Sequence, residues 1–308
     1  MILKKDLSKI GIGTWGIGGF AEKDLKIDTK KQIEALVYAF QHGLNYLDLN
    51  LWYAQGYSVD LVLDAYMTSG IKREDLFITQ KFYPFSISSI DDAKRELEKL
   101  MKLFSTDYID SAEITTTLYD KLKYEGTVEF VKYALQNGCR YTNITNANLE
   151  QLKEYHGEFG NKLFASEVGF NFEVRENINN GVIPYSMEND ILCVIYQPLR
   201  RNRTAHRNWP LLLELSVKYS KTQNQILLNW ISDKGFLPIN KVGDVSHLVE
   251  NMRSFDFKMD KSDIEKIDSF KLDSYKQPDV FYTTEGNGVR IDQLSNVFDE
   301  EYDKQQKI

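Results

Sequence analysis

The 308-residue sequence has few of the features that mark secreted or membrane-spanning proteins. It has two cysteines, Cys139 and Cys193, and both lie in apolar runs, so we expect buried thiols in a reducing cytosol. Residues 1–6 carry no long apolar core after their positive charges, which differs from a secretory signal. No window approaches the ~18 consecutive apolar residues of a membrane span. We therefore predict a cytoplasmic protein with no membrane partner.

Basic charge is also in short supply. The sequence has 38 lysines and arginines against 45 acidic residues, a net charge of -7, which argues against a nucleic-acid surface. Hydrophobic residues make up 42% of the chain, enough to bury a full core, and barrel folds of this length often form one domain. We predict no metal site.

Short apolar segments alternate with amphipathic helical patterns along most of the chain. Helices are indicated by Asp28-Thr29 and Gly43 at the two ends of one pattern and by Ser89 at the start of another. Eight strands are expected, at residues 9–14, within 43–53, and at 76–81, 108–114, 139–144, 163–168, 191–196 and 235–239. Eight strand-helix units without a linker predict an α/β fold, a single-domain (β/α)8 TIM barrel over residues 1–270.

The segment 271–308 is long and mixes aromatic with polar residues. It is expected either to pack over the barrel mouth and supply apolar walls or to be a partly disordered end. Its aromatic content favours packing.

Residues with useful chemistry fall where the predicted strands end. Asp48 and Tyr53 follow the second strand, and Lys81 ends the third. Any one such residue is more often explained by loop solubility or an ordinary salt bridge. Their shared position makes that explanation weaker for the group, because the functional residues of a closed parallel barrel gather at these strand ends. An acid, a phenol and an ammonium there predict one proton-transfer site.

The stretch 43–58 contains Gly43, Asn45-Tyr46, Asp48, Tyr53, and then Gly56 and Ser58, and it resembles the signature of the aldo-keto reductases. The resemblance runs from Ile10 to Asn251 and is closest to the channel β-subunit and sugar-ketoreductase branches. It implies a barrel that binds a nicotinamide dinucleotide, usually NADPH, without a Rossmann domain. The chain accordingly lacks a GxGxxG loop that opens a helix after a strand.

By this resemblance Tyr53 is the proton donor, Lys81 tunes it, and Asp48 holds Lys81 in place. A phenol is a weak acid, with an ordinary pKa of ~10, and a nearby ammonium favours its ionised form. The family usually carries a histidine at the end of the fourth strand, where this chain has Thr115. Loss of such a donor would cost on the order of 10²–10³ in rate. None of the four histidines lies near that position in sequence, and His206 is expected in a solvated loop.

The resemblance also implies cofactor contacts. Thr14 ends the first expected strand and Trp15 begins the loop after it, Thr145 and Asn146 correspond to a pair that binds the carboxamide, and Glu167 replaces a glutamine. The ring of Tyr196, in the segment Tyr196-Gln197-Pro198-Leu199, would stack on the nicotinamide. Residues expected at the adenosine end are Lys241, Glu250, Asn251, His247 in place of an arginine, and Arg201 with its neighbours Arg200 and Arg203.

Two functions follow from these residues. The first is an NADPH-dependent reductase acting on a small-molecule carbonyl, such as an aldehyde, ketone or keto sugar, with NADPH expected over NADH. The second is a cofactor-binding regulatory or scaffold protein that catalyses weakly, which the changes at Thr115, Glu167, Val242 and His247 favour. A lyase or aldolase using Lys81 as an amine is a third class, against which the tyrosine spacing argues. The substrate and the oligomeric state stay open.

Overall fold

Eight parallel strands close into a barrel in chain order in the computed structural model, which describes residues 2–271. Each strand pairs with its sequence neighbours, and β1 closes the barrel against β8 through Gly13 and Lys241. The predicted (β/α)8 barrel is thus confirmed. The strands are β1 Gly11–Gly13, β2 Tyr46–Leu49, β3 Phe77–Phe82, β4 Ile109–Thr115, β5 Cys139–Thr145, β6 Leu163–Gly169, β7 Leu192–Tyr196 and β8 Leu237–Lys241.

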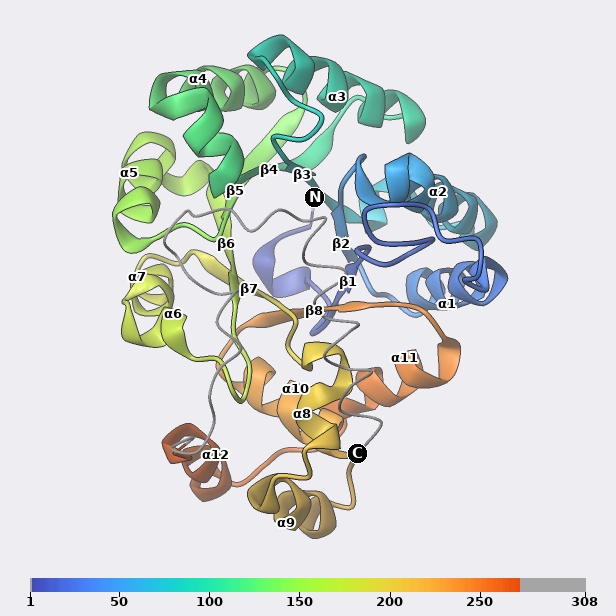
Figure 1. Ribbon diagram of the computed structural model, residues 1–308, viewed down its shortest axis with the longest axis vertical. Helices are drawn as coiled ribbons and strands as arrows, with labels where there is room; N and C mark the ends of the chain where they lie inside the picture. The colour runs from blue at the N-terminus through green and yellow to red at the C-terminus, as the bar shows by residue number, and fades with distance from the viewer. Residues whose placement is uncertain (1, 272–308) are drawn as a thin grey trace.

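Helices form an outer ring around these strands (Figure 1). Several short 3-10 turns join the elements, and one of them, Tyr53–Gly56 (η2), contributes to the site described below. The helices are α1 Thr29–Gln41, α2 Tyr57–Ser69, α3 Ile90–Leu103, α4 Thr116–Gln136, α5 Leu149–Phe159, α6 Glu176–Asn179, α7 Val182–Glu188, α8 Arg203–His206, α9 Pro210–Tyr219, α10 Gln223–Asp233, α11 Val245–Met252 and α12 Lys261–Ser269.

Polar residues fix where the helices begin. The Asp28 side chain accepts from the backbone N–H of Lys31 at the start of α1, and Ser89 and Asp92 form a reciprocal capping box at the start of α3. These side chains satisfy N–H groups that have no partner within the helix. The helix starts predicted at Asp28-Thr29 and Ser89 therefore have a physical cause.

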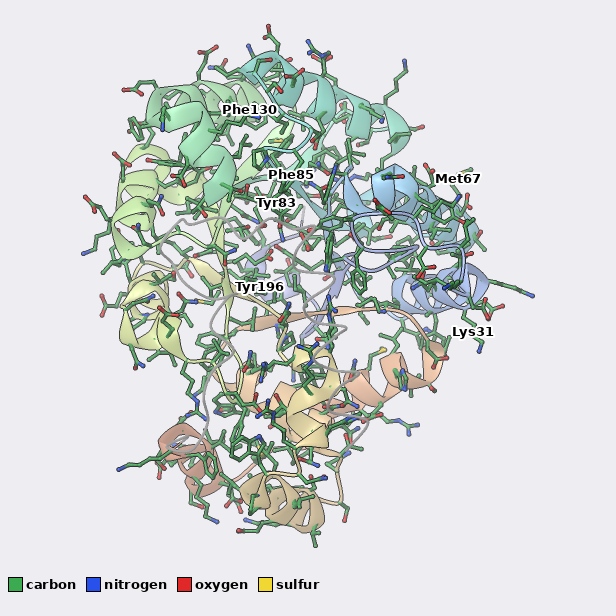
Figure 2. All side chains as sticks on the ribbon, in the orientation of Figure 1. Lys31, Met67, Tyr83, Phe85, Phe130 and Tyr196 are labelled. Carbon is green, nitrogen blue, oxygen red and sulfur yellow. The ribbon has the colours of Figure 1, made fainter. Side chains whose placement is uncertain are left out.

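The core has two parts that differ in chemistry. One is apolar and lies between strands and helices, where Phe82 of β3 packs edge-on against Phe130 of α4 at a ring distance of 4.9 Å. The other fills the lower barrel interior with aromatic rings, including Phe77 and Phe164 at 4.4 Å. Figure 2 shows Phe130 in the helical layer, Tyr83 and Tyr196 inside the ring of helices, and Met67 pointing outward. Above the aromatic layer the barrel interior is polar.

Both cysteines are buried free thiols, and burial raises the pKa of each. Among residues 2–271, the structure contains no helix long and apolar enough to cross a membrane. The packing predicted for the segment 271–308 falls, from residue 272 onward, outside the described residues.

Candidate active site

A cavity of about 1050 Å³ opens at the carboxyl ends of the strands. Thr145, Tyr196 and Lys241 are the last residues of β5, β7 and β8, and all three line it. Tyr53, which follows β2, and Lys81, near the end of β3, line the same cavity. The structure therefore brings together the strand-end residues that the sequence separates by up to two hundred positions.

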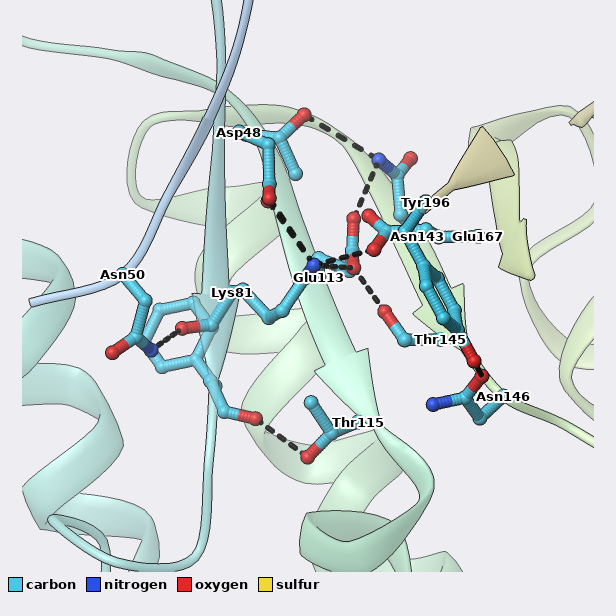
Figure 3. A network of polar contacts seen from close by, with 12 residues as sticks. Asp48, Asn50, Lys81, Glu113, Thr115, Asn143, Thr145, Asn146, Glu167 and Tyr196 are labelled. Carbon is cyan, nitrogen blue, oxygen red and sulfur yellow. Dashed lines mark hydrogen bonds and ion pairs between the residues drawn. The ribbon is translucent and has the colours of Figure 1, made fainter. Parts of the chain in front are cut away.

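The Lys81 ammonium lies among three carboxylates inside the barrel. Its Nζ atom is 2.6 Å from Glu167 Oε1, 3.2 Å from Asp48 Oδ1 and 3.4 Å from Glu113 Oε1 (Figure 3). All four side chains are at most 4% exposed. The adjacent strands β2, β3 and β4, together with β6, supply the four residues, and register places Lys81 directly beside Glu113.

One ammonium cannot neutralise three buried carboxylates, and the proton affinities reflect this. Burial alone lowers the pKa of Lys81, but Asp48, Glu113 and Glu167 together raise it well above its usual range. Burial raises the pKa of Asp48 to about 6, with Lys81 lowering it and Glu113 raising it further. Burial and the Glu113 charge also raise the pKa of Glu167 well above its usual range. Lys81 thus stays charged, while the carboxyl groups of Asp48 and Glu167 hold protons more tightly than in water.

Other polar side chains tie Glu113 to the barrel wall. The Thr145 hydroxyl donates to Glu113 Oε1, and Asn143 Nδ2 donates to Oε2 at 3.4 Å. Thr145 lies at the cavity, so these contacts connect the buried carboxylate to the surface where a ligand would bind.

Tyr53 is held by an unusual turn. Its backbone begins the turn η2, in which Ala54, Gln55 and Gly56 all have left-handed backbone angles, with φ of 50°, 59° and 92°. Asn50 braces the turn, because its side chain accepts from Trp52 N at 2.6 Å and donates to the carbonyl of Lys81. A turn of this kind persists only when its surroundings determine it.

The phenol of Tyr53 is 3% exposed and packs edge-on against Trp15 at a ring distance of 4.9 Å. Burial raises its pKa well above 10, as does nearby Tyr83, whereas Lys81 lowers it. The effect of burial on the pKa of Tyr53 outweighs that of Lys81. The free protein therefore keeps Tyr53 as a protonated phenol, the form that an acid needs.

The comparisons agree with this geometry. The sequence pattern of the aldo/keto reductase family matches residues 9–271. The chain belongs to the aldo/keto reductase family. Methylglyoxal reductase YeaE of Escherichia coli is 23% identical to it over 270 residues, which cover 85% of this chain and 90% of that protein.

Solved structures of other aldo/keto reductases share the fold. A thermostable aldo-keto reductase, Tm1743, crystallised with the inhibitor epalrestat, superposes with a TM-score of 0.77 at 29% identity, covering 85% of this chain and 95% of that chain. An aldo/keto reductase from Klebsiella pneumoniae, crystallised with NADP and acetate, has a TM-score of 0.71 at 20% identity, with 85% and 90% covered.

Most residues that the sequence predicted for the site of this aldo/keto reductase line the cavity. They are Trp15, Asp48, Tyr53, Lys81, Thr145, Asn146, Glu167, Tyr196, Gln197, Pro198, Leu199, Arg201, Lys241, His247, Glu250 and Asn251. Their contact with a cofactor or substrate stays a prediction.

Thr14 and Thr115 do not line the cavity. The Thr14 hydroxyl donates to the carbonyl of Asp48 at 2.8 Å and is fully buried. The Thr115 hydroxyl donates to the carbonyl of Phe82 at 2.8 Å and accepts from Leu118 N at 3.3 Å, so it caps α4. Figure 3 shows Thr115 apart from the Lys81 cluster. Because β4 runs into α4 with no loop between them, the helix cap takes the hydroxyl, and the geometry does not support a catalytic Thr115.

At the far end of the cavity, Lys241 lies near Arg201. The surrounding protein and the Arg201 charge lower the pKa of Lys241. Among residues 2–271, no carboxylate lies within ion-pair distance of Lys241. Arg200, by contrast, forms a buried ion pair with Glu173, so its charge is already matched. A cation with a lowered pKa and no carboxylate partner is suited to an anionic ligand.

Sequence reasoning missed three residues of the site. Glu113 lies within β4 rather than at its end, Asn50 directly follows β2, and Tyr83 lies two residues beyond Lys81. The available signal was strand alternation, because residues two apart point to the same side of a sheet. His206, expected in a solvated loop, is exposed but lines the cavity from α8.

Proposed function

We propose that this aldo/keto reductase is an NADPH-dependent carbonyl reductase in which Tyr53 gives the proton to the carbonyl oxygen. The observation that carries the proposal is the meeting of Tyr53, Lys81 and Asp48 at one wall of the cavity. When bound, the nicotinamide dinucleotide would supply the hydride. The protein supplies a positioned acid, a fixed ammonium and a site shielded from water.

The cavity suits such a cofactor at both ends. Its volume of about 1050 Å³ is at the upper end of ligand pockets, as an extended dinucleotide requires. Lys241, which has no carboxylate within ion-pair distance among residues 2–271, lies near Arg201 and offers positive charge that fits the 2′-phosphate that distinguishes NADPH from NADH. Crystals of the Klebsiella pneumoniae relative contain NADP, which agrees with this choice.

Glu167 is the residue that fits the nicotinamide end least obviously. An ionised carboxylate can only accept, whereas the family's glutamine also donates. Burial and Glu113 favour the protonated form of Glu167, which carries one O–H donor. Its Oε2 atom is buried and has no hydrogen-bond partner among residues 2–271. A protonated Glu167 would therefore offer a carboxamide both a donor and an acceptor, as a glutamine does.

The proton transfer depends on the charges around Tyr53. As the carbonyl oxygen gains negative charge, the O–H of Tyr53 passes its proton to that oxygen and leaves a phenolate. Lys81 stabilises the phenolate, and Asp48 keeps Lys81 aligned and charged. The methylglyoxal reductase named above indicates small aldehydes as the first substrates to test.

A cofactor-binding protein with weak activity is the second candidate. The capping role of Thr115 favours it, because the hydroxyl at the histidine position does not reach the cavity. A measurement of substrate turnover distinguishes the two candidate functions, because only the reductase is expected to turn over a carbonyl substrate efficiently.

The test combines titration with turnover. NADPH and NADH are titrated by fluorescence quenching, and oxidation of NADPH is then followed at 340 nm with a panel of aldehydes, ketones and keto sugars. We expect tighter binding of NADPH and turnover of at least one small aldehyde. Binding without turnover of any substrate would select the second candidate, and failure to bind either nucleotide would refute both.

A further inference from the structure

We propose that the Tyr83 hydroxyl is a second hydrogen-bond donor to the substrate carbonyl oxygen, in the role that the family gives to a histidine. The inference rests on the proposed function and adds a residue to the site. It explains how this cavity can polarise a carbonyl although Thr115 does not reach it.

The position of Tyr83 follows from strand alternation. Thr79 and Lys81 of β3 point into the barrel, where the Thr79 hydroxyl contacts Tyr46 and the Lys81 amine contacts the carboxylates. Phe82 points outward, against Phe130. Tyr83 is the next inward residue after Lys81, so its ring lies one step nearer the cavity mouth.

Tyr83 and Tyr53 lie side by side at the cavity. Their ring centroids are 6.3 Å apart, the planes are tilted by 51°, and both residues line the cavity with Lys81. A carbonyl oxygen that reaches Tyr53 would therefore meet a second phenol within the same space.

The two phenols divide the chemistry between them. Burial raises the pKa of Tyr83 to about 12, whereas the nearby Lys81 charge lowers it. Tyr83 thus stays protonated across the physiological range and can donate throughout the reaction. The transferred proton leaves the Tyr53 oxygen for the carbonyl oxygen, and the Tyr83 O–H bond stays intact. Donors of this kind contribute on the order of 10²–10³ in rate.

The test compares Tyr83→Phe with Thr115→Val and the wild type. Tyr83→Phe removes only the hydroxyl and keeps the ring, and Thr115→Val removes the hydroxyl at the histidine position. We expect kcat/KM for an aldehyde to fall on the order of 10²-fold in Tyr83→Phe. Thr115→Val is expected to keep wild-type kcat/KM. The Kd for NADPH, which reports an intact fold and cofactor site, should be unchanged in both variants.

The balance between kcat and KM separates a donor from a packing residue. A hydrogen bond to the oxygen that gains negative charge acts mainly in the transition state, so Tyr83→Phe should lower kcat more than it raises KM. A wild type that turns over, with Tyr83→Phe within threefold of it in both kcat and kcat/KM, would overturn the inference alone. A large loss in Thr115→Val would do the same. A wild type that binds NADPH without turnover would refute the proposed function and this inference together.

Discussion

Replacing Glu113 by glutamine should change how stability depends on pH, because it removes one of three carboxylates around Lys81. The oxygens of Asp48, Glu113 and Glu167 lie within 4.8 Å of one another. At that separation two negative charges repel by about 3 kcal/mol at an effective dielectric constant of about 20, or about two pKa units. Glutamine keeps the size of the side chain and an oxygen for the Thr145 hydroxyl.

The direction follows from the pKa of Asp48, which the fold raises from 3.8 to about 6. Between those pH values the folded protein binds more protons than the unfolded chain, so stability falls as pH rises through this window. For a shift of that size the loss is about 3 kcal/mol. In Glu113→Gln the repulsion is absent, so the pKa values of Asp48 and Glu167 fall and the loss becomes smaller.

Urea unfolding at half-unit steps from pH 4 to pH 7.5 measures this effect. The unfolding free energy of Glu113→Gln, minus that of the wild type, should rise by about 2 kcal/mol from pH 4 to pH 7. Glu96, whose pKa burial raises to about 7, contributes equally to both proteins and cancels in the difference. Glu96→Gln is the matched control, since it removes one buried carboxylate outside the Lys81 cluster. A difference that is flat or falls with pH would refute the assignment of repulsion to Glu113.

Three further changes test other parts of the site. Lys241→Ala should weaken NADPH binding roughly 10- to 100-fold and leave NADH binding nearly unchanged. The control Lys31→Ala, on the outer face of α1, should change the binding of neither nucleotide. Equal losses of affinity for NADPH and NADH in Lys241→Ala would contradict a contact with the 2′-phosphate. Thr115→Val should lose about 1 kcal/mol in urea unfolding, because the α4 cap and the bond to Phe82 disappear; unchanged stability would show that the cap is not needed. Asn50→Ala should lower the free energy of unfolding by about 2 kcal/mol, because the turn that holds Tyr53 loosens. It should also reduce kcat more than it changes the Kd for NADPH. An unchanged kcat would show that Tyr53 is held in place without Asn50.

Much of the fold could be predicted because its signals are local. Asp28 and Ser89 cap helices through neighbours three residues away, and each strand is a short apolar run between such helices. Alternation of strand and helix then leaves few architectures. The predicted Asp48 and Lys81 meet because parallel strands end on one rim of a barrel.

The other features of the site depend on contacts that the spacing of residues in the sequence does not reveal. The position of Thr115 in the chain matches the family's histidine, but whether its hydroxyl faces the cavity depends on the helix that begins at the next residue. Glu113 is one of four polar residues in β4, and only the closed barrel shows that it reaches Lys81. Likewise, the raised pKa of Glu167 follows from its burial in the closed barrel and from Glu113, which lies more than fifty positions away in the chain.

The most direct test of the proposed mechanism is the steady-state kcat/KM for NADPH-dependent reduction of a small aldehyde by the wild type and by Tyr53→Phe. We expect turnover in the wild type and a loss on the order of 10²–10⁴-fold in Tyr53→Phe, with the Kd for NADPH unchanged. Equal kcat/KM values in the two proteins would contradict the role of Tyr53 as the acid.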